Sequence, residues 1–91
     1  MSGPPRKREG TLREEVTGTG ECVLLDAGGG RVLALNPSAV AVWDLIDGRR
    51  DVGELARILA RAAGIELAAA EADVRALLAR LHQEGFLAEA P

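Results

Sequence analysis

The chain has few of the residues on which catalytic and metal sites usually depend. It holds one Cys and one His in 91 residues, which excludes an internal disulfide and a zinc site built from several Cys and His ligands. It has no apolar run long enough to cross a bilayer, and its polar, basic start lacks the apolar segment of a signal peptide. We therefore expect a cytoplasmic protein with no metal, no cofactor and no membrane partner.

Aromatic residues are also scarce: the chain has one Trp, one Phe and no Tyr. Hydrophobic residues nevertheless make up 47% of the chain against 27% charged, which is typical of a globular domain rather than a disordered one. Ala, Leu and Val must fill the interior, so closely packed helices are expected. The length suits one domain.

Basic residues are fewer than acidic ones, and three of them form one cluster at residues 6–8 (Arg-Lys-Arg). Without it the net charge changes from −3 to −6, and an acidic body argues against a nucleic-acid partner. The cluster follows Pro4 and Pro5 in a segment with no apolar pattern. We predict a disordered basic tail over residues 1–10 and a single domain over residues 11–91.

Three short segments have the composition of strands. Residues 12–17 are charged and suit a sheet edge, and residues 22–26 and 31–35 are short apolar runs. Glycines 28–30 lie between the last two runs and favour a β-hairpin, because glycine accepts the positive φ of a tight turn.

Three helices are expected after the strands. Asn36 and Pro37 begin the first, near residues 37–47, with an N-cap and a first-turn proline. The second begins with a capping box between Asp51 and Glu54 and ends at Gly64. The third covers about residues 67–84. The predicted fold is α+β: a three-stranded antiparallel sheet followed by three helices, like a winged helix-turn-helix.

No group of residues indicates catalysis. His82 falls near the end of the last helix, Cys22 begins a strand, and Ser38 lies in a helical first turn. Cys22 has no sequence neighbour that would activate it, the positions of His82 and Ser38 are ordinary ones for a helix end and a first turn, and no nucleophile or nucleotide motif occurs. We therefore predict that the protein is not an enzyme.

A partner has one obvious place to bind. If residues 12–17 pair with residues 22–26, then residues 31–35 form an open sheet edge, which can accept a strand from another polypeptide. The alternative is that this strand is buried on both faces. Replacing Leu33 by Pro should remove a strand N–H and weaken peptide binding.

The order of several short motifs resembles the PqqD-like family. They are residues 23–26 (Val-Leu-Leu-Asp), Gly30-Arg31, residues 35–39 (Leu-Asn-Pro-Ser-Ala) and residues 42–48 (Val-Trp-Asp-Leu-Ile-Asp-Gly). The pattern continues through the leucines of the last two helices to residues 85–87 (Gly-Phe-Leu). The resemblance covers roughly residues 21–88.

The resemblance implies a peptide chaperone. Members of the family bind the leader of a ribosomally made precursor peptide and present it to a modifying enzyme, often a radical SAM protein. The leader adds to the sheet edge in a groove closed by the last helix. Carried over by position, the groove comprises Arg31, Val32, Leu33, Ala34 and Leu35 on the strand, and Asp73, Val74, Leu77, Leu78, Leu81 and His82 on the helix. Val74, Leu77 and Leu81 are equally compatible with a place in the core.

Two features depart from the family members dedicated to pyrroloquinoline quinone synthesis. Those members typically carry a Tyr-Pro-Glu-Gly-like hairpin and a Lys before Leu-Asn, whereas here the hairpin is glycine-rich and Ala34 precedes Leu35. The sequence is closer to stand-alone members from other peptide clusters, including lasso-peptide clusters. A winged-helix DNA-binding regulator and an interaction module without a peptide ligand, for example a homodimer, remain as alternative functions.

Overall fold

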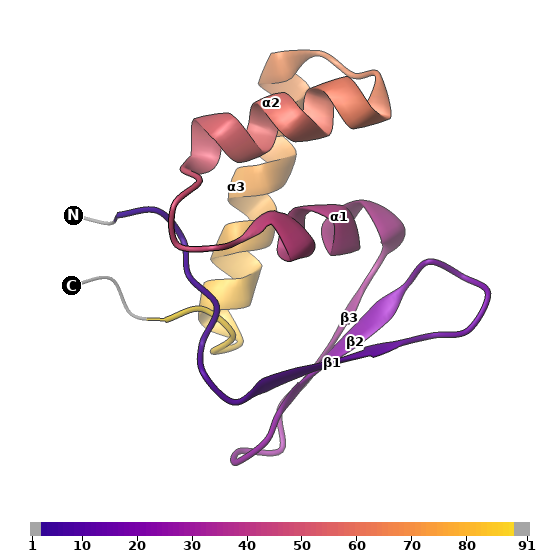
Figure 1. The fold of residues 1–91 in the computed structure, drawn as a ribbon, viewed down its shortest axis with the longest axis vertical. Coiled ribbons are helices and arrows are strands. Elements are labelled where there is room, and N and C mark those ends of the chain that lie inside the picture. The colour runs from indigo at the N-terminus through magenta and orange to yellow at the C-terminus, as the bar shows by residue number, and fades with distance from the viewer. Residues whose placement is uncertain (1–2, 89–91) are drawn as a thin grey trace.

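The computed structural model describes residues 3–88 and has three strands followed by three helices (Figure 1). The elements are β1 (Thr11–Glu15), β2 (Cys22–Asp26), β3 (Val32–Leu35), α1 (Pro37–Leu45), α2 (Val52–Ala63) and α3 (Leu67–Gln83). The predicted α+β fold is confirmed, and each element begins and ends within two residues of its predicted limits. "Winged helix-like" is only a loose description, because here the sheet precedes all the helices.

The three strands form an antiparallel sheet in the order β1-β2-β3. Leu24 lies opposite Leu33 and Cys22 opposite Leu35, and all four side chains are buried against the helices. Gly30 has a φ of +73° and closes the hairpin between β2 and β3, a conformation that a residue with a Cβ rarely adopts. The apolar runs therefore became strands because every second side chain enters the core.

Each of the first two helices begins at the cap that the sequence predicts. The Asn36 side chain accepts a 2.8 Å hydrogen bond from the Ala39 N–H at the start of α1. Asp51 and Glu54 form a complete capping box at the start of α2. Helix α2 ends at Gly64, whose φ of +67° is the left-handed conformation that stops a helix.

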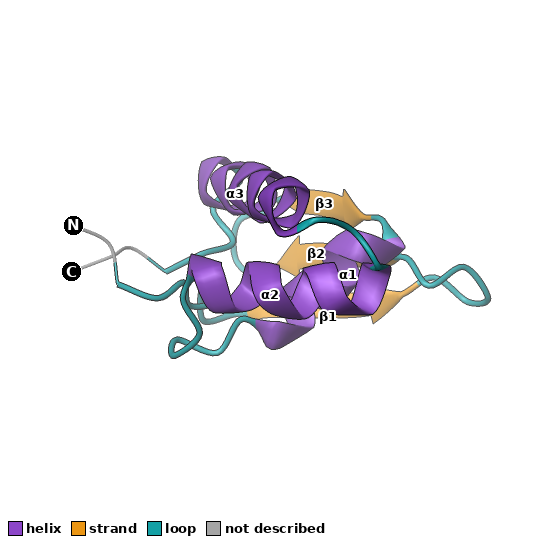
Figure 2. Ribbon diagram, turned by 90° about the horizontal axis from the view of Figure 1, so that it is seen from above, coloured by secondary structure: helices purple, strands orange, loops and turns teal. Residues whose placement is uncertain are grey.

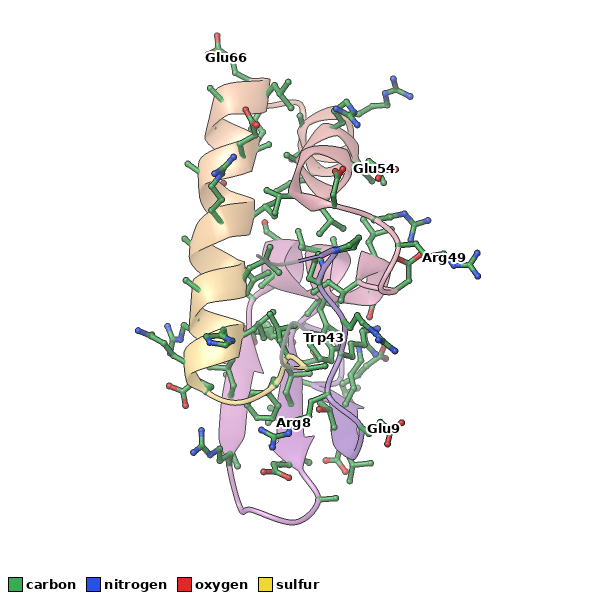
Figure 3. All side chains as sticks on the ribbon, turned by 90° about the vertical axis from the view of Figure 1, so that its left-hand side faces the viewer. Arg8, Glu9, Trp43, Arg49, Glu54 and Glu66 are labelled. Atoms are coloured by element: carbon green, nitrogen blue, oxygen red, sulfur yellow. The ribbon has the colours of Figure 1, made fainter. Side chains whose placement is uncertain are left out.

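The helices form a layer over one face of the sheet (Figure 2). Helix α1 packs on β3 and α2, and α2 packs along α3. Trp43 lies between the helical layer and the sheet (Figure 3) and is almost fully buried, as is Phe86 beyond the end of α3. Within residues 3–88, no helix combines the length and apolar character needed to cross a bilayer.

Residues 5–8 differ from the disordered tail predicted over residues 1–10. The backbone of this segment pairs with residues 86–88: the Arg8 N–H donates to the Phe86 carbonyl at 3.1 Å, and the Ala88 N–H donates to the Arg6 carbonyl at 2.8 Å. The N–H of Gly48 also donates to the Pro5 carbonyl. The apolar pattern did not reveal this pairing because its inter-segment backbone hydrogen bonds use groups that every residue except proline carries, whatever its side chain. Residues 1–2 of the predicted tail lie outside the described residues.

Candidate peptide-binding site

The edge of the sheet formed by β3 is open in the described part of the chain. In the strand order β1-β2-β3, β2 occupies one side of β3, and no strand pairs with the other side. Leu33 and Leu35 point into the core, whereas Val32 and Ala34 are exposed, with 59% of Val32 accessible. The strand is therefore buried on one face only, and the alternative of burial on both faces is excluded for it.

The register shows which backbone groups face this open edge. The Asp26 N–H donates to the Arg31 carbonyl at 3.0 Å, so these two residues form a hydrogen-bonded pair between β2 and β3. Hydrogen-bonded and non-hydrogen-bonded pairs alternate in an antiparallel ladder, so Leu33 and Leu35 also bond to β2. The N–H and C=O groups of Val32 and Ala34 point the other way, toward the open edge.

Helix α3 lies on the β3 side of the sheet, as Figures 2 and 3 both show. It packs chiefly against α2 and has few backbone contacts with β3. A pocket of about 420 Å³ opens where the end of β3 meets the helices. The residues that line it come from the start of α1, from α2 and the turn after it, and from α3: Asn36, Ser38, Ala39, Val42, Leu59, Ala63, Ile65, Asp73, Ala76 and Leu77.

The other end of β3 is basic. The guanidinium of Arg31 lies beside Gly85, just after α3, where a Cβ placed on Gly85 would be 3.1 Å from Arg31 Nη1. Arg8 Nη1 donates a 3.3 Å hydrogen bond to the Gly85 carbonyl. Two cations thus gather at the C-terminal end of α3, where the helix dipole is negative. The pocket at the opposite end of β3 carries the carboxylate of Asp73.

The helix residues predicted for the groove divide into two groups. Val74 and Leu81 have no exposed surface and belong to the core, where they support the site from beneath. Asp73 and Leu77 line the pocket, Leu78 is half-buried against the core, and His82 is exposed. The binding role of the strand and helix residues stays a prediction, and the structure adds the restriction that only exposed side chains can touch a ligand.

Of the residues that line the pocket, sequence reasoning assigned only Asp73 and Leu77 to the groove, and it missed the others, among them Asn36, Ile65 and Ala76. Ala76 follows Asp73 by three positions, which places the two on one helical face, and this spacing was available in the sequence. Ile65 gives a weaker signal, because it lies in the turn between α2 and α3 and enters the pocket only through their packing. Asn36 was interpreted as a helix cap, and it serves as one.

Cys22 carries a thiol, which could act as a nucleophile, and the pKa of this thiol differs from its ordinary value. Its thiol is fully buried, and burial raises its pKa, which disfavours the reactive thiolate. The nearby Arg13 guanidinium opposes this effect without cancelling it. Cys22 therefore behaves as a small core residue.

The sequence of residues 21–87 matches the family described as Coenzyme PQQ synthesis protein D (PqqD). The chain belongs to the PqqD family. A solution structure of the PqqD truncation of PqqCD from Methylobacterium extorquens, described as a functional and stand-alone RiPP recognition element, is 34% identical in sequence. The alignment covers 93% of this chain and 88% of that one, with a TM-score of 0.77. No curated protein sequence matches this PqqD-family chain significantly.

Two more distant structures share the fold. One is lasso peptide synthetase B1 complexed with the leader peptide, at 23% identity, with a TM-score of 0.81 and coverage of 96% of this chain and 100% of that one. The other is TbiB1 in complex with the TbiA(beta) leader peptide, at 17% identity and a TM-score of 0.80, covering 94% and 98% of the two chains. The PqqD fold is thus common to proteins of widely different sequence.

Proposed function

We propose that this protein is a non-catalytic peptide chaperone that binds the leader of a ribosomally made precursor peptide and presents it to a modifying enzyme. The observation that carries the proposal is the open edge of β3, with the backbone groups of Val32 and Ala34 directed outward beside α3. Membership of the PqqD family supports it, as do the leader peptides bound by two proteins of the same fold.

The leader binds as a fourth strand of the sheet. Val32 and Ala34 offer two N–H donors and two C=O acceptors, each worth about 0.5–1.5 kcal/mol when paired. Such backbone bonds contribute affinity but little selectivity, since every peptide carries the same groups. Selectivity comes from the side chains of the leader, half of which point toward α3.

The pocket between α1, α2 and α3 receives one of these side chains. Leu59, Ile65 and Leu77 make its lining largely apolar, while Asp73 places a carboxylate at its wall. We expect an apolar leader residue there. Arg31 lies at the opposite end of β3, so an acidic leader residue at that end gains a charge-assisted hydrogen bond.

The chemistry is left to the partner enzyme, for which a radical SAM protein or another maturation enzyme is suitable. Support for a non-catalytic domain comes from Cys22, whose thiol is buried and held neutral by that burial. His82 is exposed on α3 and lies on the helix that borders the peptide edge. We place the protein in the cytoplasm with its precursor. A homodimer is a competing arrangement.

Calorimetric titration of the purified domain with the leader of the precursor peptide encoded beside it tests the proposal. We expect saturable one-to-one binding that depends on β3. A folded domain that binds neither the leader alone nor the leader in the presence of the modifying enzyme would contradict the proposal. Light scattering in the same buffer checks for a dimer that hides β3.

A further inference from the structure

The face of the sheet that points away from the helices is unusually apolar. The register places Leu12, Leu25 and Val32 in one row across the three strands, and Val23 beside Ala34 in the next row. Leu12 is 53% exposed and Val32 59% exposed. An antiparallel sheet with one solvated face normally alternates apolar and polar side chains, and a continuous apolar patch on a surface commonly marks an interface. We call these five residues the outer patch.

None of the described elements covers the outer patch, because all three helices lie on the opposite side of the sheet (Figures 1 and 2). Glu14 is the one charged residue that the register places among these rows, opposite Val23. The outer patch is therefore an apolar surface with a carboxylate at the β1 side. A surface that complements it has an apolar centre and a Lys or Arg facing Glu14.

The size of the outer patch decides against a second copy of the chain as its occupant. Strands lie about 4.8 Å apart and rise about 3.3 Å per residue, so two rows across three strands cover on the order of 200 Å². A stable protein–protein interface buries roughly 800 Å² on each partner. The outer patch alone is therefore too small for a lasting dimer, and it suits a transient partner that gains area elsewhere.

The bound leader supplies that extra area. A strand added to β3 has alternate side chains on the two faces of the sheet, so half of the leader residues lie beside Val32 and Ala34 on the outer face. The outer patch and the leader then form one continuous four-stranded surface. A protein that docks there contacts the carrier and its cargo together.

We propose that the outer patch is the docking surface for the peptide-modifying enzyme, which recognises the patch and the outward side chains of the bound leader as one composite surface. This inference rests on the proposed function, because it requires a leader strand on β3. The enzyme surface is apolar at its centre with a basic residue opposite Glu14. The enzyme therefore binds the loaded domain more tightly than the free domain.

The test uses the purified domain, the leader peptide and the modifying enzyme encoded with that precursor. Leu12→Lys places a charge in the outer patch at the strand farthest from β3, and Glu14→Lys reverses the charge beside it. Leu67→Lys is the matched control, because Leu67 is 45% exposed but lies on α3. Calorimetry first measures the affinity of each variant for the leader. The affinity of the leader-bound domain for the enzyme is then measured with the domain immobilised on a sensor surface.

We expect Leu12→Lys and Glu14→Lys to bind leader as the wild type does and to bind enzyme at least tenfold more weakly, with Leu67→Lys unchanged in both. If Leu12→Lys fails to fold by circular dichroism, Glu14→Lys decides. If both variants, Leu12→Lys and Glu14→Lys, are folded and bind the enzyme as tightly as the wild-type domain does, the proposal is overturned. Equal enzyme affinity with and without leader would overturn the composite surface.

Two other results would also overturn it. A wild-type domain that sediments as a dimer, and becomes monomeric on Leu12→Lys substitution, would assign the outer patch to a second copy. A wild-type domain that binds no leader, observed before any enzyme is added, would remove the proposed function and this inference with it. Loss of enzyme binding with leader binding intact is therefore the result that only the docking surface explains.

Discussion

Leu33 and Ala34 are neighbours on β3, but their backbone groups face opposite sides of the strand. The N–H of Leu33 faces β2, and the N–H of Ala34 faces the open edge, as the register and the Asp26–Arg31 hydrogen bond require. A change to the backbone N–H of Leu33 therefore tests the stability of the sheet, whereas the same change at Ala34 tests its capacity to accept a peptide.

Replacing Ala34 by Pro should weaken leader binding while the domain remains folded. Pro removes the outward N–H, and edge strands tolerate Pro where the N–H faces solvent. We expect about a fivefold to tenfold loss of affinity, which corresponds to about 1 kcal/mol for one hydrogen bond. Calorimetry with the leader measures it, and Ala34→Val, which keeps the N–H, is the control.

Leu33→Pro should instead destabilise the whole domain, since it removes a bond of the β2–β3 ladder and a buried side chain. The variant that the sequence suggests as a binding test is therefore a folding test. If Leu33→Pro melts like the wild type and loses only peptide binding, the backbone assignment along β3 is reversed.

Filling the pocket beside α3 should block the leader without harming the fold. Ala76 lines the pocket and is exposed, so Ala76→Trp places a large ring in the space that we assign to an apolar leader side chain. We expect at least a tenfold loss of leader affinity by calorimetry. Ala72→Trp, at an exposed position of α3 outside the pocket lining, is the matched control. Equal affinity for both variants would place the leader elsewhere.

Trp43 should carry a large share of the stability. Its ring is almost fully buried, and the Lys7 ammonium lies 4.9 Å from the ring centroid. Trp43→Ala should lower the free energy of unfolding by roughly 3–5 kcal/mol, as for a buried aromatic residue. Lys7→Met should cost about 0.5–1 kcal/mol through the lost cation–π contact. Urea denaturation measures both losses of stability, with Arg49→Ala at an exposed position as the control. If Lys7→Met is as stable as the wild type, the cation–π contact contributes nothing to stability.

Asp47 should make stability depend on pH in the acid range. Hydrogen bonds from the backbone N–H groups of Arg50 and Arg49 hold the pKa of the Asp47 carboxyl below its ordinary value of 3.8. A carboxyl whose pKa is lower in the folded state stabilises the fold above its unfolded pKa, and this stabilisation is lost as pH falls through the folded pKa.

The stability difference between the wild type and Asp47→Ala should therefore be constant near neutral pH and shrink below pH 3.8. Denaturation at a series of pH values measures it. Asp47→Asn keeps an oxygen that can accept both bonds but does not titrate, so the difference between it and the wild type isolates the charge. If the stability difference between the wild type and Asp47→Ala does not change with pH, the two hydrogen bonds do not lower the pKa of the Asp47 carboxyl in the folded state.

Local sequence patterns predicted most of the fold because each was a strong local preference. Asn36 and Pro37 begin α1, the Asp51–Glu54 box begins α2, and Gly64 ends it, each through contacts within a few residues. The tail was less predictable: Arg6 and Arg8 pair with residues 86–88, nearly the full length of the chain away. Nothing within ten residues of Arg8 signals that partner.

By itself, the sequence determined the order of the elements and the family. These depend on periodicity, caps and short motifs, all of which act over a few residues. Only the tertiary structure decided that Val74 and Leu81 are core while Asp73 and Leu77 reach a pocket, because a helix has one apolar stripe and its packing partner selects which part is covered. The tertiary structure also assembled the outer patch, since Leu12, Leu25 and Val32 meet only through the register of three paired strands.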